Sequence, residues 1–319
     1  MHRRRTLPPA VAVLLTTVTL AAALGLGGCS SSGSTEGRTM SDPVETTVDG
    51  VAVKLLEVGA APTAPLAWFS DEGTQSGKFR VTTGLGQHTE GGDAEGTAEG
   101  ELPYSEVTME IPLSATVSTD GEDLESTVTA GTPTGDKEAR NSDIATAEGF
   151  RMVQKYSDDG KVATRSFSSP ESATDSARAS VEQGFGLMTD LPLVFPAEPV
   201  GAGARWTVTG QIDDVAAGAS MKQVVTYTLT SRSDSVISLG VDISRTPAVR
   251  QMAGTELQVM DSTSESGGSL TLDLRRPVPV GGSVRTRTVV TYGQPGSPVS
   301  VVQESKTTLT WSGEDAAGQ

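Results

Sequence analysis

Apolar residues at every second position constrain this chain most, because only a β-strand places alternate side chains on one face. The clearest run comprises Val107, Met109, Ile111, Leu113, Ala115 and Val117, with mostly polar residues between them. It predicts a strand with one apolar and one solvated face in an antiparallel sheet. Pro112 has no N–H to donate, which predicts that this strand lies at a sheet edge or carries a bulge.

Alternating runs recur later in the chain, at 225–229, 237–243 and 270–274, with polar or glycine-containing turns between them. We therefore predict a mainly β fold of antiparallel meander sheets with one or two short helices. The strands would form two β-rich halves of similar outline, with a half-barrel as one arrangement of them. A true internal repeat and a chance likeness between two meanders both stay open.

Two local features have more specific expectations. The predicted helix has Ser169 as its N-cap, Pro170 in its first turn and Gly184 at its end. The stretch 84–101 is rich in glycine and acidic residues. It is expected to be a solvated hairpin tip rather than a calcium loop, because it lacks the ligand spacing of an EF-hand.

Residues 1–28 have the three parts of an export signal. Arg3, Arg4 and Arg5 form a charged start, residues 11–26 are largely apolar, and small residues precede Cys29. The apolar run is too short and too rich in threonine and glycine to favour a membrane-spanning helix. Cys29 is the only cysteine of the chain, and it stands where the signal ends. An ordinary secretory signal followed by a chance cysteine is the alternative.

The sequence Leu-Gly-Gly-Cys at 26–29 resembles the lipobox of bacterial lipoproteins. The resemblance implies cleavage between Gly28 and Cys29 and a diacylglycerol on the Cys29 thiol, with acylation of the amine left open. One acyl chain holds a protein to a membrane only marginally, whereas two or three give a durable anchor. The expected location is therefore the outer face of the cell membrane, with the lipid on Cys29 as the contact.

The segment 191–206 is rigid in its first part, since Pro192, Pro196 and Pro199 keep it extended, and Gly201 and Gly203 then permit a reversal. We interpret it as a packed connector. The expected organisation is a signal peptide (1–28), a flexible tether (29–43), an N-terminal β-rich half (44–190), the connector (191–206), a C-terminal β-rich half (207–312) and a loose tail (313–319).

Composition disfavours several classes of function. The formal net charge of −16 argues against nucleic acid as a partner and against adhesion to anionic headgroups. His2 leaves with the signal, so a Ser-His-Asp triad could use only His88, and zinc needs several His or Cys ligands. Among 40 acidic residues no pair stands out as a glycosidase site. We expect no catalytic residue, no cofactor and no metal.

The order of features resembles a group of uncharacterised bacterial, in particular actinobacterial, lipoproteins with a domain of unknown function. The resemblance rests on Leu-Leu-x-x-Gly-Ala-x-Pro at 55–62, a hairpin at 117–121, and Phe-Pro-x-Glu-Pro-Val-Gly-x-Gly-Ala-x-Trp at 195–206. It covers most of residues 50–312 and implies no particular activity. More loosely, the expected meander is similar to the LolA/LppX-type lipoproteins, whose half-barrels hold acyl chains; likeness of fold alone is a weak basis for function.

Two functions follow as expectations. In the first, the protein is a non-enzymatic envelope lipoprotein whose sheet binds or carries an apolar ligand such as a lipid. In the second, it is an envelope scaffold that meets other proteins through its connector or loops. A sheet whose apolar faces leave no cavity would contradict the first.

Overall fold

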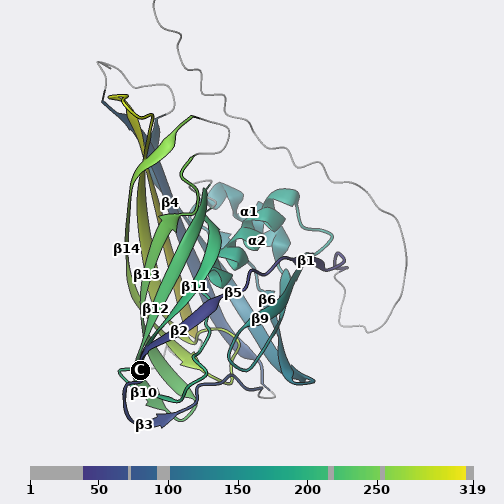
Figure 1. Cartoon of the computed structure of the whole chain (residues 1–319). Helices are drawn as coiled ribbons and strands as arrows, with labels where there is room; N and C mark the ends of the chain where they lie inside the picture. Colours follow the sequence, from purple (N-terminus) through teal and green to yellow (C-terminus); the bar gives the residue numbers. More distant parts are fainter. Residues whose placement is uncertain (1–38, 71–72, 92–100, 215–218, 252–255, 314–319) are drawn as a thin grey trace, which may run out of the picture. The chain divides into compact units, whose positions relative to one another are not determined.

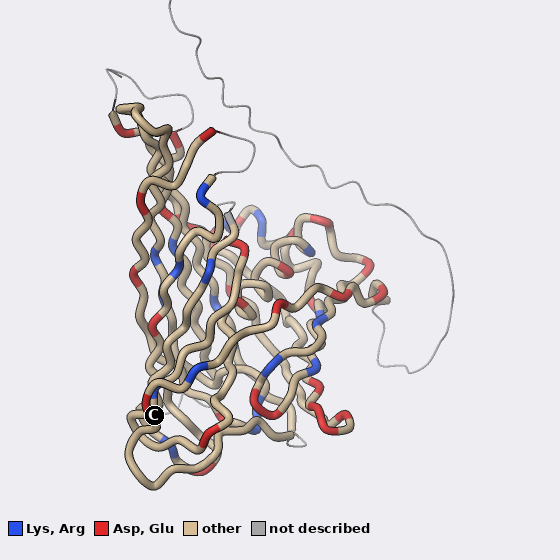
Figure 2. The backbone as a smooth tube through the Cα atoms, in the orientation of Figure 1, with Lys and Arg blue, Asp and Glu red and all other residues tan. Residues whose placement is uncertain are grey.

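The computed structural model describes residues 39–70, 73–91, 101–214, 219–251 and 256–313. Residues 38–319 form one compact unit. Its hydrophobic core is built from residues between Leu66 and Trp311, so a chain that lacks the signal keeps every contact of that core. Charged residues of both signs are spread along its strands and loops (Figure 2).

One large antiparallel sheet of fourteen strands dominates this body. In order across the sheet its strands are β1 (Val44–Thr46), β9 (Val162–Ser168), β8 (Arg151–Tyr156), β6 (Asp123–Ala130), β5 (Leu102–Asp120), β4 (Gln75–Glu90), β16 (Ser300–Gly313), β15 (Gly281–Gly293), β14 (Gln258–Asp273), β13 (Val236–Pro247), β12 (Ala219–Ser233), β11 (Arg205–Asp214) and β2 (Ala52–Glu57). β7 (Thr134–Gly135) pairs with β5, and β3 (Ala60–Ala64) pairs separately with β10 (Val200–Ala202). The predicted mainly β, antiparallel fold with few helices is confirmed.

The two expected halves share this sheet. β4 and β16 pair from Gly77 opposite Gly313 to Glu90 opposite Ser300, which joins the strands before the connector to those after it. The first two strands of the chain, β1 and β2, lie at the two opposite edges. Residues 47–51, which we call the strap, therefore run from one edge of the curved sheet to the other (Figure 1).

The main helix, α2 (Asp175–Thr189), begins and ends later than the sequence predicts. Its N-cap is Thr174, whose hydroxyl accepts a hydrogen bond of 3.1 Å from the Ala177 N–H. Ser169 is not the cap, because the helix begins only at Asp175. The Ser169 carbonyl instead accepts a hydrogen bond of 2.8 Å from the Ser41 N–H. Residues at the end of the expected tether thus pair with the body.

Gly184 does not end the helix but lies inside it, where it allows close packing. A Cβ at this position would lie 2.8 Å from Cε of Met109 and 3.2 Å from Cδ1 of Ile111. The other helical turns are short: η1 (Glu138–Arg140), α1 (Asn141–Ile144) and η2 (Ala145–Ala147).

The expectation of a hairpin tip over 84–101 is wrong for its first part, because β4 continues to Glu90. Tyr104 on the neighbouring strand packs against Gly84 and Gly86: a Cβ at Gly84 would collide with its ring, and a Cβ at Gly86 would lie 3.0 Å from its Cβ. The glycines therefore make room for an aromatic side chain within the sheet. Residues 92–100 lie outside the described part.

Of the two arrangements predicted for the Pro112 strand, an edge position or a bulge, the edge position is wrong, since β5 is an interior strand that pairs with β4 and β6. Pro112 lies where β6 ends and β7 takes over as the neighbour of β5. The Pro112 carbonyl accepts a hydrogen bond of 2.7 Å from the Gly131 N–H on that side. The backbone N–H that Pro112 lacks is therefore at a point where the hydrogen bonding between β5 and its neighbours on that side is interrupted.

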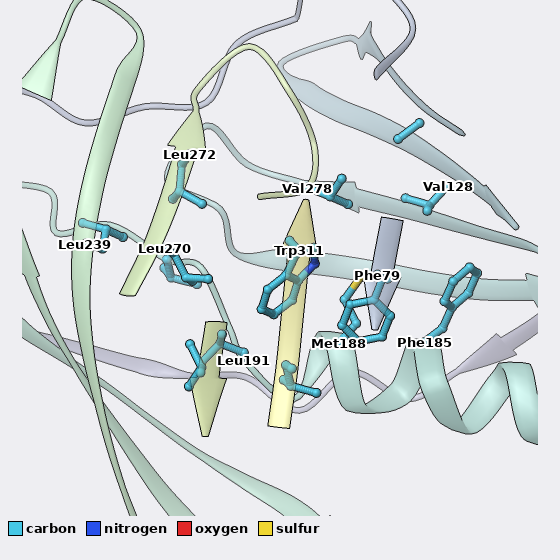
Figure 3. Packing of buried hydrophobic residues seen from close by; sticks show 14 of the residues in the cluster. Phe79, Val128, Phe185, Met188, Leu191, Leu239, Leu270, Leu272, Val278 and Trp311 are labelled. Atoms are coloured by element: carbon cyan, nitrogen blue, oxygen red, sulfur yellow. The ribbon is translucent and has the colours of Figure 1, made fainter. Parts of the chain in front are cut away.

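α2 packs on the inner face of the sheet and contributes most of the buried side chains that come from helices. Phe185 and Met188 of α2 lie close to Phe79 and Trp311 of the sheet (Figure 3). Phe79 and Trp311 contact each other with ring centroids 5.2 Å apart. All four side chains are at most 6% exposed, so burial of this helix face stabilises the curved sheet.

The connector is packed into the same core. Phe195 stacks on Trp68 with centroids 5.3 Å apart and meets the edge of Trp206 at 6.4 Å. The Tyr227 hydroxyl donates a hydrogen bond of 2.8 Å to the Pro192 carbonyl. Trp206 is fully buried, whereas its neighbour Arg205 is exposed and pairs with Glu57 at 3.0 Å.

Candidate ligand-binding cavity

A cavity of about 710 Å³ opens where the two edges of the sheet face the end of α2. Its walls come from the strap, from β8 and β9 on one side, from β11 and β12 on the other, and from α2 with the connector. Ligand pockets in proteins commonly measure about 300–1,000 Å³. The apolar faces of the sheet therefore leave a cavity of ligand size.

Much of the cavity wall is apolar. Met152 and Tyr156 contribute from β8, Leu187 from α2, and Leu193 from the connector, while Trp68 and Trp311 line further parts of the wall. Met152 and Tyr156 share one face of β8 because every second side chain of a strand points the same way. A hydrocarbon chain would find van der Waals partners along such walls.

Five charged side chains line the cavity: Asp49 of the strap, Lys161, Arg165 of β9, Asp190 (the C-cap of α2) and Asp213 of β11. Burial shifts the pKa of two of them, Arg165 and Asp190. With the Gln154 amide on β8 oriented so that its oxygen faces Arg165, this oxygen accepts hydrogen bonds of 3.1 and 3.2 Å from Nε and Nη2 of Arg165. Burial lowers the pKa of Arg165, and the charge of Asp190 partly offsets this.

Burial raises the pKa of Asp190 to about 6. Arg245 and Arg165 oppose this shift by attracting the carboxylate, whereas Asp214 and Asp213 add to it by repulsion. The Asp190 carboxyl group therefore changes its charge close to neutral pH.

A buried polar network holds the end of α2 to the sheet. Nε2 of Gln223 donates a hydrogen bond of 2.6 Å to the main-chain oxygen of Asp190. Oε1 of Gln223 accepts one of 2.9 Å from Nε of Arg245. Nη1 of Arg245 lies 3.9 Å from Oδ2 of Asp214. The same oxygen accepts a hydrogen bond of 3.1 Å from the Ser305 hydroxyl. The network links four strands, β11, β12, β13 and β16, to the helix.

This network was not predicted from the sequence, although the period-two pattern contains a signal for it. The inward positions of β13 run Ile237, Leu239, Val241, Ile243 and then Arg245. In the same way Gln223 continues the inward run of β12. A polar residue at the next in-phase position of an apolar run is a candidate buried group.

The residues predicted from sequence lie elsewhere. Cys29 and Gly28 lie outside the described residues. His88 is an exposed residue of β4 with Nε2 3.2 Å from Oε1 of Glu90, and it does not line the cavity. Within the described ranges, no three His, Cys, Asp or Glu side chains are grouped to hold a metal ion. None of the helices in these ranges has the length and apolarity to cross a bilayer.

Comparisons with known proteins add little. No protein-family model and no curated protein matches this chain. Among solved structures, a mutant of Rh. blastica porin has 9% identity and a TM-score of 0.19, with 75% of this chain and 99% of that chain covered. A structure titled "Asymmetric conductivity of engineered proteins" has 7% identity and a TM-score of 0.19, with 74% and 99% covered. Scores this low support no assignment of fold or function.

Proposed function

We propose that this protein is an exported, lipid-anchored lipoprotein of the cell envelope that binds or carries an apolar ligand such as a lipid, without catalysis. The single observation that carries the binding role is the cavity of about 710 Å³ between the sheet edges and α2. The anchored location rests on the export signal and on Cys29 after Gly28.

The energetics favour a hydrocarbon ligand. Each methylene group removed from water contributes about 0.8 kcal/mol, so a chain of about ten carbons would gain about 8 kcal/mol before the costs of ordering. Side chains such as Met152, Leu187 and Leu193 offer that burial. A covalent anchor on Cys29 would keep the body within reach of the membrane from which it takes its ligand.

The alternative role, an envelope scaffold that meets other proteins, has less support. The connector was the most specific surface expected for a partner, but Val194, Phe195 and Trp206 are at most 2% exposed. A partner would therefore have to recognise loops or the outer face of the sheet.

Gly186 offers a way to block the cavity without disturbing the core. It lies on α2 and lines the cavity, and a Cβ at this position would have no atom within 4 Å. Gly186→Phe should therefore place a ring in the cavity. Gly267→Phe is the matched control, because a Cβ on Gly267 also meets nothing within 4 Å and Gly267 does not line the cavity.

The test is mass spectrometry of lipid that co-purifies with the signal-less Cys29→Ser chain from a bacterial host. We expect stoichiometric lipid in the parent and in Gly267→Phe, and a loss of most of it in Gly186→Phe. A parent that stays empty after exposure to lipids of its native host would overturn the proposal. Crosslinking in intact cells would then test the scaffold role.

A further inference from the structure

We propose that the ligand of this cavity is an anionic amphiphile, whose carboxylate or phosphate binds the guanidinium of Arg165 while its hydrocarbon lies along the apolar walls. This inference rests on the proposed function and specifies the chemistry of the ligand.

The first observation is that Arg165 lacks a carboxylate partner. It lines the cavity and is half-buried. Its side chain contacts the neutral amide of Gln154 and, within the described ranges, forms no ion pair. More exposed arginines of the same protein are paired: Arg80 with Glu110 at 2.6 Å and Arg205 with Glu57 at 3.0 Å. A cation at a partly dehydrated site is costly unless an anion joins it.

The second observation is that Asp190 does not meet this need. Its carboxyl group interacts electrostatically with Arg165 but forms no ion pair with it. The Asp190 carboxylate is also attracted by Arg245, so it is shared between two cations. The other buried carboxylate, Asp214, lies beside Arg245 instead. The positive charge of Arg165 is therefore available to a ligand.

The third observation is the position of Arg165 in the cavity. It lies opposite Thr46 of the edge strand β1 and opposite Gln154 of β8. The strap begins at Thr47, directly after β1, and lines the same cavity. An acidic group on Arg165 would thus sit beside the strap, while the apolar parts of the wall around Trp68 and Trp311 take the chain.

The net charge of −16 does not contradict this assignment. Net charge acts at the distance of a membrane surface and is screened within about 10 Å at ordinary salt. A guanidinium inside a cavity acts at contact distance and can hold an acidic group with two parallel hydrogen bonds.

The experiment compares probes that share one acyl chain. Four probes are titrated below their critical micelle concentrations into delipidated, signal-less Cys29→Ser protein. Palmitate and lysophosphatidic acid with a palmitoyl chain are anionic, monopalmitoylglycerol is neutral and palmitoylcholine is cationic. We expect the two anionic probes to bind at least about tenfold more tightly than the neutral glyceride, since charge-assisted hydrogen bonds contribute about 1.5–3 kcal/mol. The palmitate and lysophosphatidic acid titrations also distinguish a carboxylate from a phosphate.

Variants assign the effect to the residue. Arg165→Gln should remove most of the preference for anionic probes and leave the affinity for monopalmitoylglycerol unchanged. Arg165→Lys should retain part of the preference because it keeps the charge. Arg151→Gln is the matched control, since Arg151 is an exposed residue of the adjacent strand β8 and does not line the cavity.

The outcomes separate this inference from the proposed function. Three results would overturn the inference and leave lipid binding intact. They are equal binding of anionic and neutral probes, tighter binding of the cationic probe, and an equal loss of affinity for every probe in Arg165→Gln. If no probe binds the parent protein, the proposed function itself fails.

Discussion

The indole N–H of Trp206 donates a hydrogen bond of 2.9 Å to the main-chain oxygen of Val194. The donor stands at the start of β11 and the acceptor twelve residues earlier in the connector, so the bond closes the connector on itself. Both residues are at most 2% exposed. The carbonyl of Val194 therefore has no water to replace this donor.

Trp206→Phe should destabilise the protein by about 1–3 kcal/mol, because it leaves a buried carbonyl without its donor and removes part of a packed ring. Trp68→Phe is the comparison. The N–H of Trp68 donates a longer bond of 3.3 Å to Leu193, so its loss should cost less. Urea denaturation of both variants measures the two free energies of unfolding. Equal stability of Trp206→Phe and the parent would show that the bond contributes nothing.

A second prediction compares two glycines of one helix. Gly186→Ala should stabilise the protein by about 0.5–1 kcal/mol, because alanine has the higher helix propensity and the new Cβ meets no atom within 4 Å. Gly184→Ala should lose that gain, since its Cβ would lie 2.8 Å from Cε of Met109. Thermal unfolding should thus rank Gly186→Ala above Gly184→Ala, and the reverse order would contradict the packing described here.

Most of the strands could be predicted from the sequence, because alternation is a local pattern and each strand reveals its buried face by itself. The run from Val107 to Val117 is an example: its odd positions from Ile111 to Val117 are buried as part of β5, whereas Val107 at its start is 49% exposed. The ends of elements were harder. β4 continues through Gly84 and Gly86, where it pairs with β16 and packs against Tyr104 of β5, and no local pattern contains these contacts.

The cavity could not be predicted in the same way. It exists because β1 and β2, adjacent in sequence, lie at opposite edges of the sheet, and strand order is a long-range property. No sequence pattern around Arg165 indicates that its side chain lines a cavity. Its half-buried position becomes clear only once β9 lies beside β1 and β8.

A third prediction concerns the buried pair of Arg245 and Asp214, whose side chains are 8% and 7% exposed. Arg245→Met should destabilise the protein by about 3–5 kcal/mol, because it leaves the Asp214 carboxylate buried without its cation. The double variant Arg245→Met/Asp214→Asn should recover part of this loss. Arg80→Met, in an exposed pair with Glu110, should cost no more than about 1 kcal/mol.

Chemical denaturation at pH 7 measures these three variants together with the single variant Asp214→Asn. Additive effects of the two single substitutions in the double variant would show that Arg245 and Asp214 do not interact. A loss in Arg245→Met as small as that in Arg80→Met would show that the buried position is irrelevant.

The last prediction concerns the pH dependence that Asp190 gives to stability. Its pKa in the folded protein is about 6, against 3.8 for the free side chain, so the folded state binds the proton more tightly than the unfolded state. The contribution of Asp190 to stability therefore falls as the pH rises from about 4 to about 6 and stays low above that range. Asp190→Asn mimics the neutral form and removes this dependence. The main-chain oxygen that receives the hydrogen bond from Gln223 stays in place.

Asp190→Asn should therefore gain stability over the parent at pH 7.5, by an amount of order 1–3 kcal/mol. This advantage should shrink toward zero near pH 4, where the Asp190 carboxyl group is protonated in the parent. Urea midpoints of both proteins at pH 4, 5, 6 and 7.5 measure the difference. A constant difference between Asp190→Asn and the parent across the series would mean that Asp190 titrates normally, and that its charge is as well solvated in the cavity as in the unfolded chain.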